Sequence, residues 1–258
     1  MIDVLDDAAR RVHADGYAIV EGVLSAEYVS RAKSELLEAI ARESEFHGGA
    51  DHADHGMVML CSLYGGAFLE LFDNEKLTGV FDRVLSDGCI VYAYTSSSMP
   101  PSGDNYSTRV HVDCPRLIPG YMTNMGATIL LDDFTADNGA TRFLPRSFDR
   151  AEPPSVEEFD RDAQQVIASA GSVFFFNARL WHSGGLNGTG DWRHALTLNM
   201  CRPWMKQRID IPRAMQERGV TEMSEAAAQK LGWWSRVPAS YEEYYRPLTE
   251  RLFKQEAE

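Results

Sequence analysis

The chain of 258 residues is 44% hydrophobic and carries a formal net charge of -13. This length can bury one sizeable core, so we expect one domain, helical over about 1–88, a barrel over about 89–203 and helical again over about 204–258. The acidic balance argues against a nucleic-acid partner, because proteins that bind phosphate backbones usually display a basic patch.

Neither a secretory leader nor an apolar run of bilayer length is visible in the sequence. This predicts a cytoplasmic protein without a membrane partner. The cysteines have no CxxC spacing, so we expect free thiols in a reducing compartment. They are Cys61, Cys89, Cys114 and Cys201.

The first part of the chain predicts helices. A short N-terminal helix is expected to end before Gly16. A second helix over 26–43 follows Ser25 as N-cap, because its apolar positions recur at helical spacing. A third is expected over 75–85. The apolar positions of the second helix are Val29, Ala32, Leu36 and Ile40.

Strands dominate the middle of the chain, where short apolar or alternating runs are bounded by turn residues. The sequence Asp-Asn-Gly at 137–139 indicates a hairpin turn between two of them. Their order predicts a mainly β fold with flanking helices, a double-stranded β-helix of the jelly-roll type. The expected strands are 89–97, 107–113, 121–133, 140–145, 172–177 and 192–201.

From Pro212 onward the chain is expected to be helical again. An aromatic cluster in this part either packs a C-terminal helix on the barrel or covers the barrel mouth. Three loops have the composition of substrate-contacting segments, namely 46–56, 96–105 and the region after Cys201. The aromatic cluster consists of Trp233, Trp234, Tyr241, Tyr244 and Tyr245.

His111 and Asp113 are the most informative pair in the sequence. On an extended segment, residues at i and i+2 point to the same face, so an imidazole and a carboxylate would lie side by side. His182, just beyond a buried strand, would add a second imidazole. Two histidines and one carboxylate form the facial triad of mononuclear iron sites, which leaves half of an octahedral coordination sphere open for cosubstrate and dioxygen.

The same HxD spacing occurs twice more in the chain. His13 and Asp15 close the expected N-terminal helix, whereas His52 and Asp54 lie in a stretch rich in glycine and histidine without a strand pattern. Neither context favours a metal site.

Two arginines lie close to these ligands in the expected fold. Arg193 opens the return strand after His182. Its guanidinium suits a dicarboxylate, because it can bind a carboxylate through two parallel charge-assisted hydrogen bonds. Arg109, two residues before His111, would share the ligand-bearing face. It contacts the cosubstrate or the substrate, or it is a solvated strand residue.

These motifs, in this order, resemble those of the phytanoyl-CoA dioxygenase family of iron(II)/2-oxoglutarate oxygenases. Residues 15–25 resemble the opening strand of the family, and residues 137–148 resemble its NGAT…PGSH segment. The separation between His182 and Arg193 equals the family's separation between distal iron ligand and 2-oxoglutarate anchor. The resemblance runs almost from end to end.

The resemblance implies iron(II) bound by His111, Asp113 and His182, with 2-oxoglutarate and dioxygen as cosubstrates. The keto-carboxylate end of 2-oxoglutarate would chelate the iron, and Arg193 would pair with its far carboxylate. Thr141 occupies the position where related enzymes place a threonine that hydrogen-bonds the cosubstrate; the alternative is a strand threonine chosen for β-propensity.

One segment departs from the family pattern. Pro-Arg-Ser-Phe at 145–148 replaces PGSH, so the glycine and the terminal histidine are lost. No role is carried over to Phe148.

The activity that the resemblance implies is hydroxylation of a C–H bond of a small molecule, in secondary metabolism, with release of succinate and carbon dioxide. Desaturation, cyclisation and epoxidation are further outcomes of the same chemistry. A carrier- or CoA-linked substrate and the oligomeric state stay open. The negative surface disfavours a strongly anionic substrate, unless Arg109, Arg116 or Arg202 forms a local basic pocket.

Three alternative functions are weaker. A halogenase of the same fold would replace Asp113 with glycine or alanine. A zinc hydrolase could use the same three ligands, since zinc accepts them and keeps an open position, but it leaves Arg193 unexplained. A non-catalytic barrel that only binds a ligand would not need an intact triad.

Overall fold

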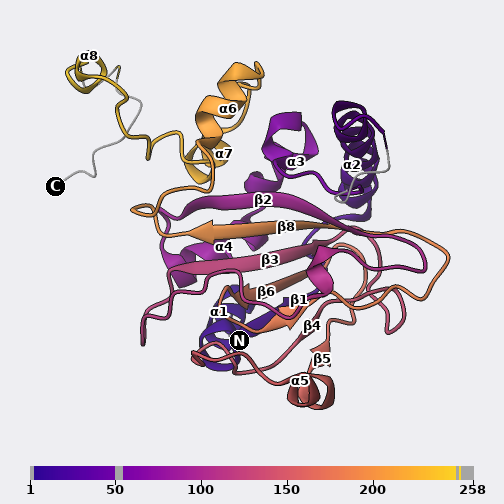
Figure 1. Cartoon of the computed structure of the whole chain (residues 1–258). Helices are drawn as coiled ribbons and strands as arrows, with labels where there is room; N and C mark the ends of the chain where they lie inside the picture. The colour runs from indigo at the N-terminus through magenta and orange to yellow at the C-terminus, as the bar shows by residue number, and fades with distance from the viewer. Residues whose placement is uncertain (1–2, 50–54, 248–249, 251–258) are drawn as a thin grey trace.

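The computed structural model describes residues 3–49, 55–247 and 250. Its largest layer is a five-stranded antiparallel sheet in the order β1-β6-β3-β8-β2, which crosses the centre of Figure 1. The strands are β1 (Tyr17–Val20), β2 (Ile90–Met99), β3 (Asn124–Leu130), β6 (Val173–Asn177) and β8 (Arg193–Cys201).

A smaller antiparallel sheet in the order β5-β4-β7 forms a second layer. Its strands are β4 (Arg142–Phe143), β5 (Gln164–Gln165) and β7 (His182–Ser183). Phe174 of the large sheet contacts Phe143 of the small sheet, with ring centroids 5.0 Å apart. The residues between the sheets form one apolar cluster, Leu130, Phe134, Ala140, Phe143, Val166, Phe174, Phe176, Leu180 and Ala195.

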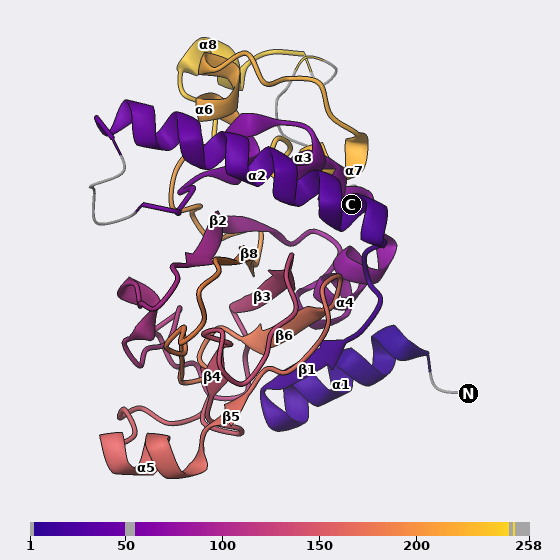
Figure 2. The same ribbon diagram turned by 90° about the vertical axis from the view of Figure 1, so that its right-hand side faces the viewer.

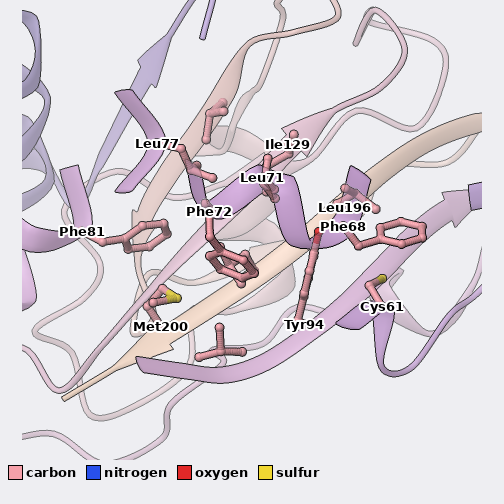
Figure 3. Packing of buried hydrophobic residues seen from close by; sticks show 14 of the residues in the cluster. Cys61, Phe68, Leu71, Phe72, Leu77, Phe81, Tyr94, Ile129, Leu196 and Met200 are labelled. Carbon is pink, nitrogen blue, oxygen red and sulfur yellow. The ribbon is translucent and has the colours of Figure 1, made fainter. Parts of the chain in front are cut away.

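Helices cover the opposite face of the large sheet, where α2 runs across the fold in Figure 2. Phe68 and Phe72 meet the ring of Tyr94 of β2 edge-on, with centroids 6.4 and 5.7 Å apart (Figure 3). No helix in the described ranges is long and apolar enough to cross a bilayer. The helices of this layer are α1 (Val4–Asp15), α2 (Ala26–Phe46), α3 (Ala67–Glu70), α4 (Glu75–Leu85), α6 (Ile211–Glu217) and α7 (Glu225–Lys230).

The expected N-terminal helices are confirmed, and their ends follow from local chemistry. The side chains of Ser25 and Asn74 accept hydrogen bonds from backbone N–H groups in the first turns of α2 and α4. Gly16 ends α1 with a φ of 87°, a left-handed conformation that glycine adopts at little cost. The four cysteines are free, as the sequence predicts.

The prediction of a strand over 107–113 is wrong. The chain instead forms a short 3-10 helix, η3 (Tyr106–Thr108), and then a single bridge at His111. The side chain of Asn105 accepts hydrogen bonds from the backbone and the hydroxyl of Ser107, and Thr108 donates its hydroxyl to the carbonyl of Asn105. Such local bonds compete with strand pairing, which the β-like composition does not reveal.

The expected strand over 121–133 is shortened to β3, so residues 114–123 form a loop. The aromatic cluster of the C-terminal part does not act as a unit. Trp233 packs against the helical core, whereas Tyr241, Tyr244 and Tyr245 are exposed on and beside α8 (Tyr241–Tyr244). These tyrosines therefore neither cover the mouth nor pack a helix on the sheet. The remaining helix, α5 (Val156–Asp162), lies beyond the small sheet.

Gly126 of β3 creates the space for one wall of the site. A Cβ at this position would lie 2.2 Å from Cζ of Phe176, whose ring centroid is 4.9 Å from that of His182. We predict that Gly126→Ala lowers the free energy of unfolding by roughly 1–3 kcal/mol, the usual cost of overpacking. The measurement is urea unfolding of the wild-type and variant proteins.

The control is Gly190→Ala, because a Cβ there meets nothing within 4 Å and the residue is exposed. It should change stability by less than about 0.5 kcal/mol. In a Phe176→Leu background the cost of Gly126→Ala should fall, since the leucine side chain is smaller than the phenyl ring that the new Cβ would meet. Equal stability of the two glycine variants would contradict this packing.

Candidate metal centre

Three potential ligands converge at the edge of the small sheet. Nε2 of His111 and Nε2 of His182 lie 3.5 and 3.7 Å from Oδ1 of Asp113. The ligand atoms of the three residues all lie within 4.8 Å of one another. A metal ion between them would be bound by two imidazoles and one carboxylate, the facial set that the sequence predicts.

Backbone contacts orient both imidazoles. Nδ1 of His111 lies 2.7 Å from the carbonyl oxygen of Arg109, and Nδ1 of His182 lies 2.9 Å from that of Leu180. A carbonyl can only accept, so each Nδ1 carries the proton and each Nε2 presents its lone pair to the site. Burial lowers the pKa of His182, which favours the neutral form that binds metal.

The carboxylate of Asp113 is half-buried and stays ionised. Burial by itself would raise the pKa of Asp113, but the contacts with the imidazoles of His111 and His182 and a hydrogen bond from Asn199 hold it below its ordinary value. Nδ2 of Asn199 lies 3.3 Å from Oδ2 of Asp113. This bond uses one carboxylate oxygen and leaves Oδ1 for the metal side.

The ligands line a cavity of about 80 Å³ that also reaches Arg193 and Thr141. Arg193 is only 2% exposed. Two of its nitrogens donate to the carbonyls of Ser97 and Gly139, at 3.2 and 2.9 Å, while its Nε has no partner among the described residues. The cavity therefore holds a metal-ligand set and a buried cation together.

Burial lowers the pKa of Arg193 to about 10, because the charged form loses hydration. The ring of Phe134 lies under the guanidinium at 4.3 Å, and within the described ranges no carboxylate forms an ion pair with it. The charge of Asp132 favours the charged form of Arg193 only in part, and a buried cation without a directly paired carboxylate is costly unless a ligand supplies one. A buried cation therefore shares this cavity with the three potential metal ligands.

The remaining predicted site residues are placed differently. Thr141 lines the cavity, and its hydroxyl makes no hydrogen bond with the described part of the chain. Arg109 is exposed and does not line the cavity. Of the other HxD pairs, Asp15 binds Arg146 and lies in no metal-ligand cluster of the described residues. The pair at 52 and 54 lies outside the described residues.

The sequence reasoning missed three polar residues of the site. Thr197 and Asn199 follow Arg193 on the same face of β8. Thr128 of the neighbouring strand β3 pairs with Thr197. The alternation of side chains along a strand was the signal, because Thr197 and Asn199 must face the same side of β8 as Arg193. Small hydroxyl side chains on this inward face leave room for a ligand where a core would carry larger apolar groups.

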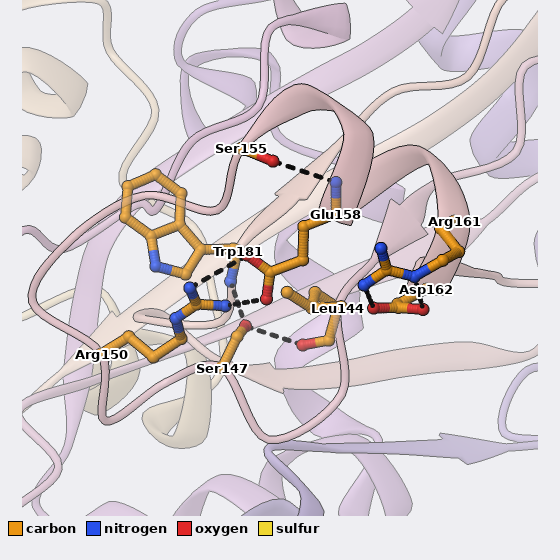
Figure 4. Close-up of polar contacts among 8 residues, drawn as sticks. All are labelled: Leu144, Ser147, Arg150, Ser155, Glu158, Arg161, Asp162 and Trp181. Carbon is orange, nitrogen blue, oxygen red and sulfur yellow. Dashed lines mark hydrogen bonds and ion pairs between the residues drawn. The ribbon is translucent and has the colours of Figure 1, made fainter.

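Ser147 holds the segment that carries His182. Its hydroxyl accepts a hydrogen bond from the backbone N–H of Trp181 at 3.0 Å and donates to the carbonyl of Leu144 at 2.7 Å (Figure 4). In the PGSH-like motif, Arg146 stands at the glycine position and adopts a φ of 59°, a conformation that favours glycine. Ser147 therefore has a structural role, although the residues beside it differ from those of the family motif.

The three converging side chains fit a mononuclear metal site of the two-histidine, one-carboxylate type. The chain belongs to the phytanoyl-CoA dioxygenase family, whose model, Phytanoyl-CoA dioxygenase (PhyH), matches residues 12–195. An uncharacterized protein of Mycobacterium tuberculosis is 32% identical over 97% of this chain and 94% of its own length. The resemblance that the sequence suggested is thereby confirmed.

Two further comparisons extend this family assignment. An Fe(II)/2-oxoglutarate-dependent dioxygenase of Aspergillus novofumigatus is 24% identical over 90% of this chain and 82% of its own length. The crystal structure of the epimerase SnoN in complex with Fe3+, alpha-ketoglutarate and nogalamycin RO has a TM-score of 0.63 at 20% identity. That match covers 80% of this chain and 87% of the epimerase, and it shows a shared fold.

We predict that Ser147→Ala weakens metal binding although every ligand is retained. The variant loses both hydrogen bonds of the Ser147 hydroxyl. One of them holds the backbone N–H of Trp181, directly before His182, so His182 is held less firmly. Loss of such outer contacts costs about tenfold or more in metal affinity. The affinity can be measured by competition with a chromophoric chelator, beside a thermal melt.

Ser155→Ala is the matched control. Ser155 caps α5 by accepting from the N–H of Glu158 at 3.1 Å, away from the ligands (Figure 4). It should cost about 1 kcal/mol of stability and leave metal affinity unchanged. Equal affinities in the two serine variants would refute the positioning role of Ser147.

Proposed function

We propose that the protein is an iron(II)- and 2-oxoglutarate-dependent oxygenase that oxidises a C–H bond of a small molecule. One observation carries the proposal: a convergent metal-ligand triad and a buried, carboxylate-free arginine share a single cavity. The relatives support it, since one of them bears this cosubstrate dependence in its name. Succinate and carbon dioxide would be the coproducts.

The donor set fits ferrous iron. His111 and His182 would bind through neutral imidazole nitrogens and Asp113 through a carboxylate oxygen, so the protein contributes one negative charge and three of six ligands. Iron bound with 2-oxoglutarate supplies the activation of dioxygen, which side chains alone cannot perform. The residues of the chain supply position and shield the reacting atoms from water.

Arg193 would bind the far carboxylate of 2-oxoglutarate. Its free Nε–H is a donor already stripped of water, so a carboxylate gains a charge-assisted hydrogen bond without displacing an intramolecular partner. The rings of Phe134 and Phe176 exclude water around the guanidinium and the metal ligands. We also propose that Thr141 donates its hydroxyl to the cosubstrate.

Arg109 would act from outside the cavity. It is exposed, and its carbonyl orients His111, so its guanidinium can reach a cosubstrate or substrate only from the cavity entrance. This makes it the second choice as an anion anchor.

We further propose hydroxylation as the outcome and the double-stranded β-helix as the architecture, with the whole chain as one oxygenase domain. The two packed antiparallel sheets with the ligands at one edge support this architecture. The presence of Asp113 disfavours a halogenase, because its carboxylate fills the coordination position that a halide would need. A zinc hydrolase would have no use for Arg193.

We predict that the purified protein binds one iron(II) and converts 2-oxoglutarate to succinate. His111→Ala and His182→Ala should each abolish both properties, because two remaining protein ligands cannot hold a facial site. Iron content and succinate release measure the effect. Arg10→Ala, which removes an exposed side chain from α1, is the control and should match the wild type. Turnover with normal iron content in either ligand variant would exclude the triad.

We predict that Arg193→Gln raises the Michaelis constant for 2-oxoglutarate while iron binding survives. Removing a buried charged partner costs on the order of 2–5 kcal/mol, which corresponds to at least about thirtyfold. Arg193→Lys keeps the positive charge but loses the two-pronged guanidinium, so its Michaelis constant for 2-oxoglutarate should lie between those of the wild type and Arg193→Gln. An unchanged constant in Arg193→Gln would transfer the anchor role to Arg109, which Arg109→Gln would then reveal.

A further inference from the structure

A second cavity, of about 220 Å³, lies next to the metal centre. Its wall begins at Cys114, which directly follows Asp113, and includes Asn177, which directly follows Phe176. The loop over 114–123, expected from the sequence to be partly strand, forms most of one side. None of the three loops that the sequence marks for substrate contact contains this segment, although Arg202 follows Cys201.

Three guanidinium groups face this cavity against a single carboxylate, that of Asp149. Arg179 is 8% exposed and donates to backbone carbonyls, among them those of Phe148 and Pro115. Arg202 donates to backbone carbonyls too. Carbonyls do not neutralise a full charge, so the cavity is positive within a chain whose net charge is -13.

Arg116 is the available cation among the three. It is exposed at the cavity and makes no hydrogen bond or ion pair with the described residues. Its guanidinium can therefore bind an anion without breaking an existing contact, unlike those of Arg179 and Arg202.

Asn124 supplies an independent sign of a ligand. It is 3% exposed, it lines the cavity, and its Oδ1 has no hydrogen-bond partner in the described structure. The carboxylate of Asp113 can only accept, so Asn199 must turn its Nδ2 toward Asp113 and its Oδ1 toward Asn124. Asn124 must then donate its Nδ2 to Asn199, at 3.1 Å, which leaves its carbonyl oxygen as a buried acceptor. A buried acceptor of this kind requires an O–H or N–H donor.

The rest of the cavity wall is largely apolar. Leu117, Ile118, Met122 and Phe148 contribute to it, and the ring of Tyr121 lies under Arg202 at 4.8 Å. Such a wall would contact a hydrocarbon or aromatic body. Asn124 connects this wall through Asn199 to Asp113, one of the potential metal ligands.

We propose that this cavity is the substrate site and that the substrate is a small organic anion, a carboxylate or phosphate on an apolar body with an O–H or N–H group. The anionic head binds at Arg116, the apolar body lies along the wall, and the donor group pairs with Oδ1 of Asn124, which is linked through Asn199 to the ligand Asp113. This inference deepens the proposed function and rests on it, because the bound anion is a substrate only if the protein is an oxygenase. The sequence disfavours an anionic substrate unless Arg109, Arg116 or Arg202 forms a local basic pocket, and two of these three arginines line this cavity.

The test uses a fluorescent probe with the same three features. 8-Anilinonaphthalene-1-sulfonate carries an anion, an aromatic body and an N–H, and N-phenyl-1-naphthylamine is its neutral analogue. Arg116→Gln should weaken binding of the anionic probe about tenfold, because one charge-assisted contact is lost. Binding of the neutral probe should not change. Arg213→Gln, which removes an exposed charge from α6, is the matched control and should bind both probes as the wild type does.

Displacement of the anionic probe then identifies the head group. Wild-type protein is titrated with 1-naphthoate and with 1-naphthyl phosphate, which share one apolar body, and the stronger competitor shows whether the site prefers a carboxylate or a phosphate. Displacement by either should be weakened in Arg116→Gln. Equal binding of the anionic probe to the wild type and to Arg116→Gln, or displacement by neither naphthalene anion, would overturn the proposal.

Probe binding requires neither iron nor 2-oxoglutarate, so the two proposals can fail separately. Probe binding that depends on Arg116, in a protein that never releases succinate, would remove the oxygenase function and keep an anion site. Succinate release with probe binding that ignores Arg116 would keep the function and place the substrate elsewhere.

Discussion

The metal centre depends on one pair of backbone hydrogen bonds between His111 and His182. Each N–H donates to the carbonyl of the other residue, at 2.9 and 3.0 Å, in an isolated antiparallel bridge. Among the described residues the segment around His111 has no other strand pairing, and its further backbone contacts are the hydrogen bonds of Cys114 to Ala178 and of Gly184 to Ser107. Backbone pairing sets the imidazoles at 4.3 Å between ring centroids and directs both to the same side. Local unfolding of this bridge would remove the metal site without unfolding the large sheet.

Strand β8 joins this centre to Arg193, the proposed anion anchor. Arg193 and Asn199 lie on one face of the strand, so a single rigid element carries the buried cation at one end and the partner of Asp113 toward the other. Between them Thr197 faces the cavity. Because β8 is paired on both sides, by β2 and β3, its side chains are held at fixed separations. Rigid support of this kind is what positioning of a cosubstrate against a metal requires.

Much of this could be predicted from the sequence because its signals are local or periodic. The cap at Ser25 and the apolar spacing after it located one helix, and the pattern of His111, Asp113 and His182 predicted three residues whose potential ligand atoms the structure brings together. The segment over 107–113 could not be predicted, since the hydrogen bonds of Asn105 outweigh its β-like composition. The expected strand over 121–133 began too early for a related reason, because Tyr121, Met122 and Thr123 line a cavity rather than continue β3.

The polar lining of the site shows the other limit of sequence reasoning. Alternation along β8 could have placed Thr197 and Asn199, but pairing between β3 and β8 brings in Thr128, and register between distant strands is not visible in one sequence. The contact of Asn124 with Asn199 likewise depends on that register. The substrate cavity is therefore a property of the folded chain.

The most direct test of the account is a crystal structure of the protein grown without oxygen in the presence of manganese(II) and 2-oxoglutarate. The account predicts manganese bound by Nε2 of His111, Nε2 of His182 and a carboxylate oxygen of Asp113, with the far carboxylate of 2-oxoglutarate hydrogen-bonded to Nε of Arg193. A metal ion bound by other residues, or a 2-oxoglutarate whose far carboxylate lies away from Arg193, would contradict it.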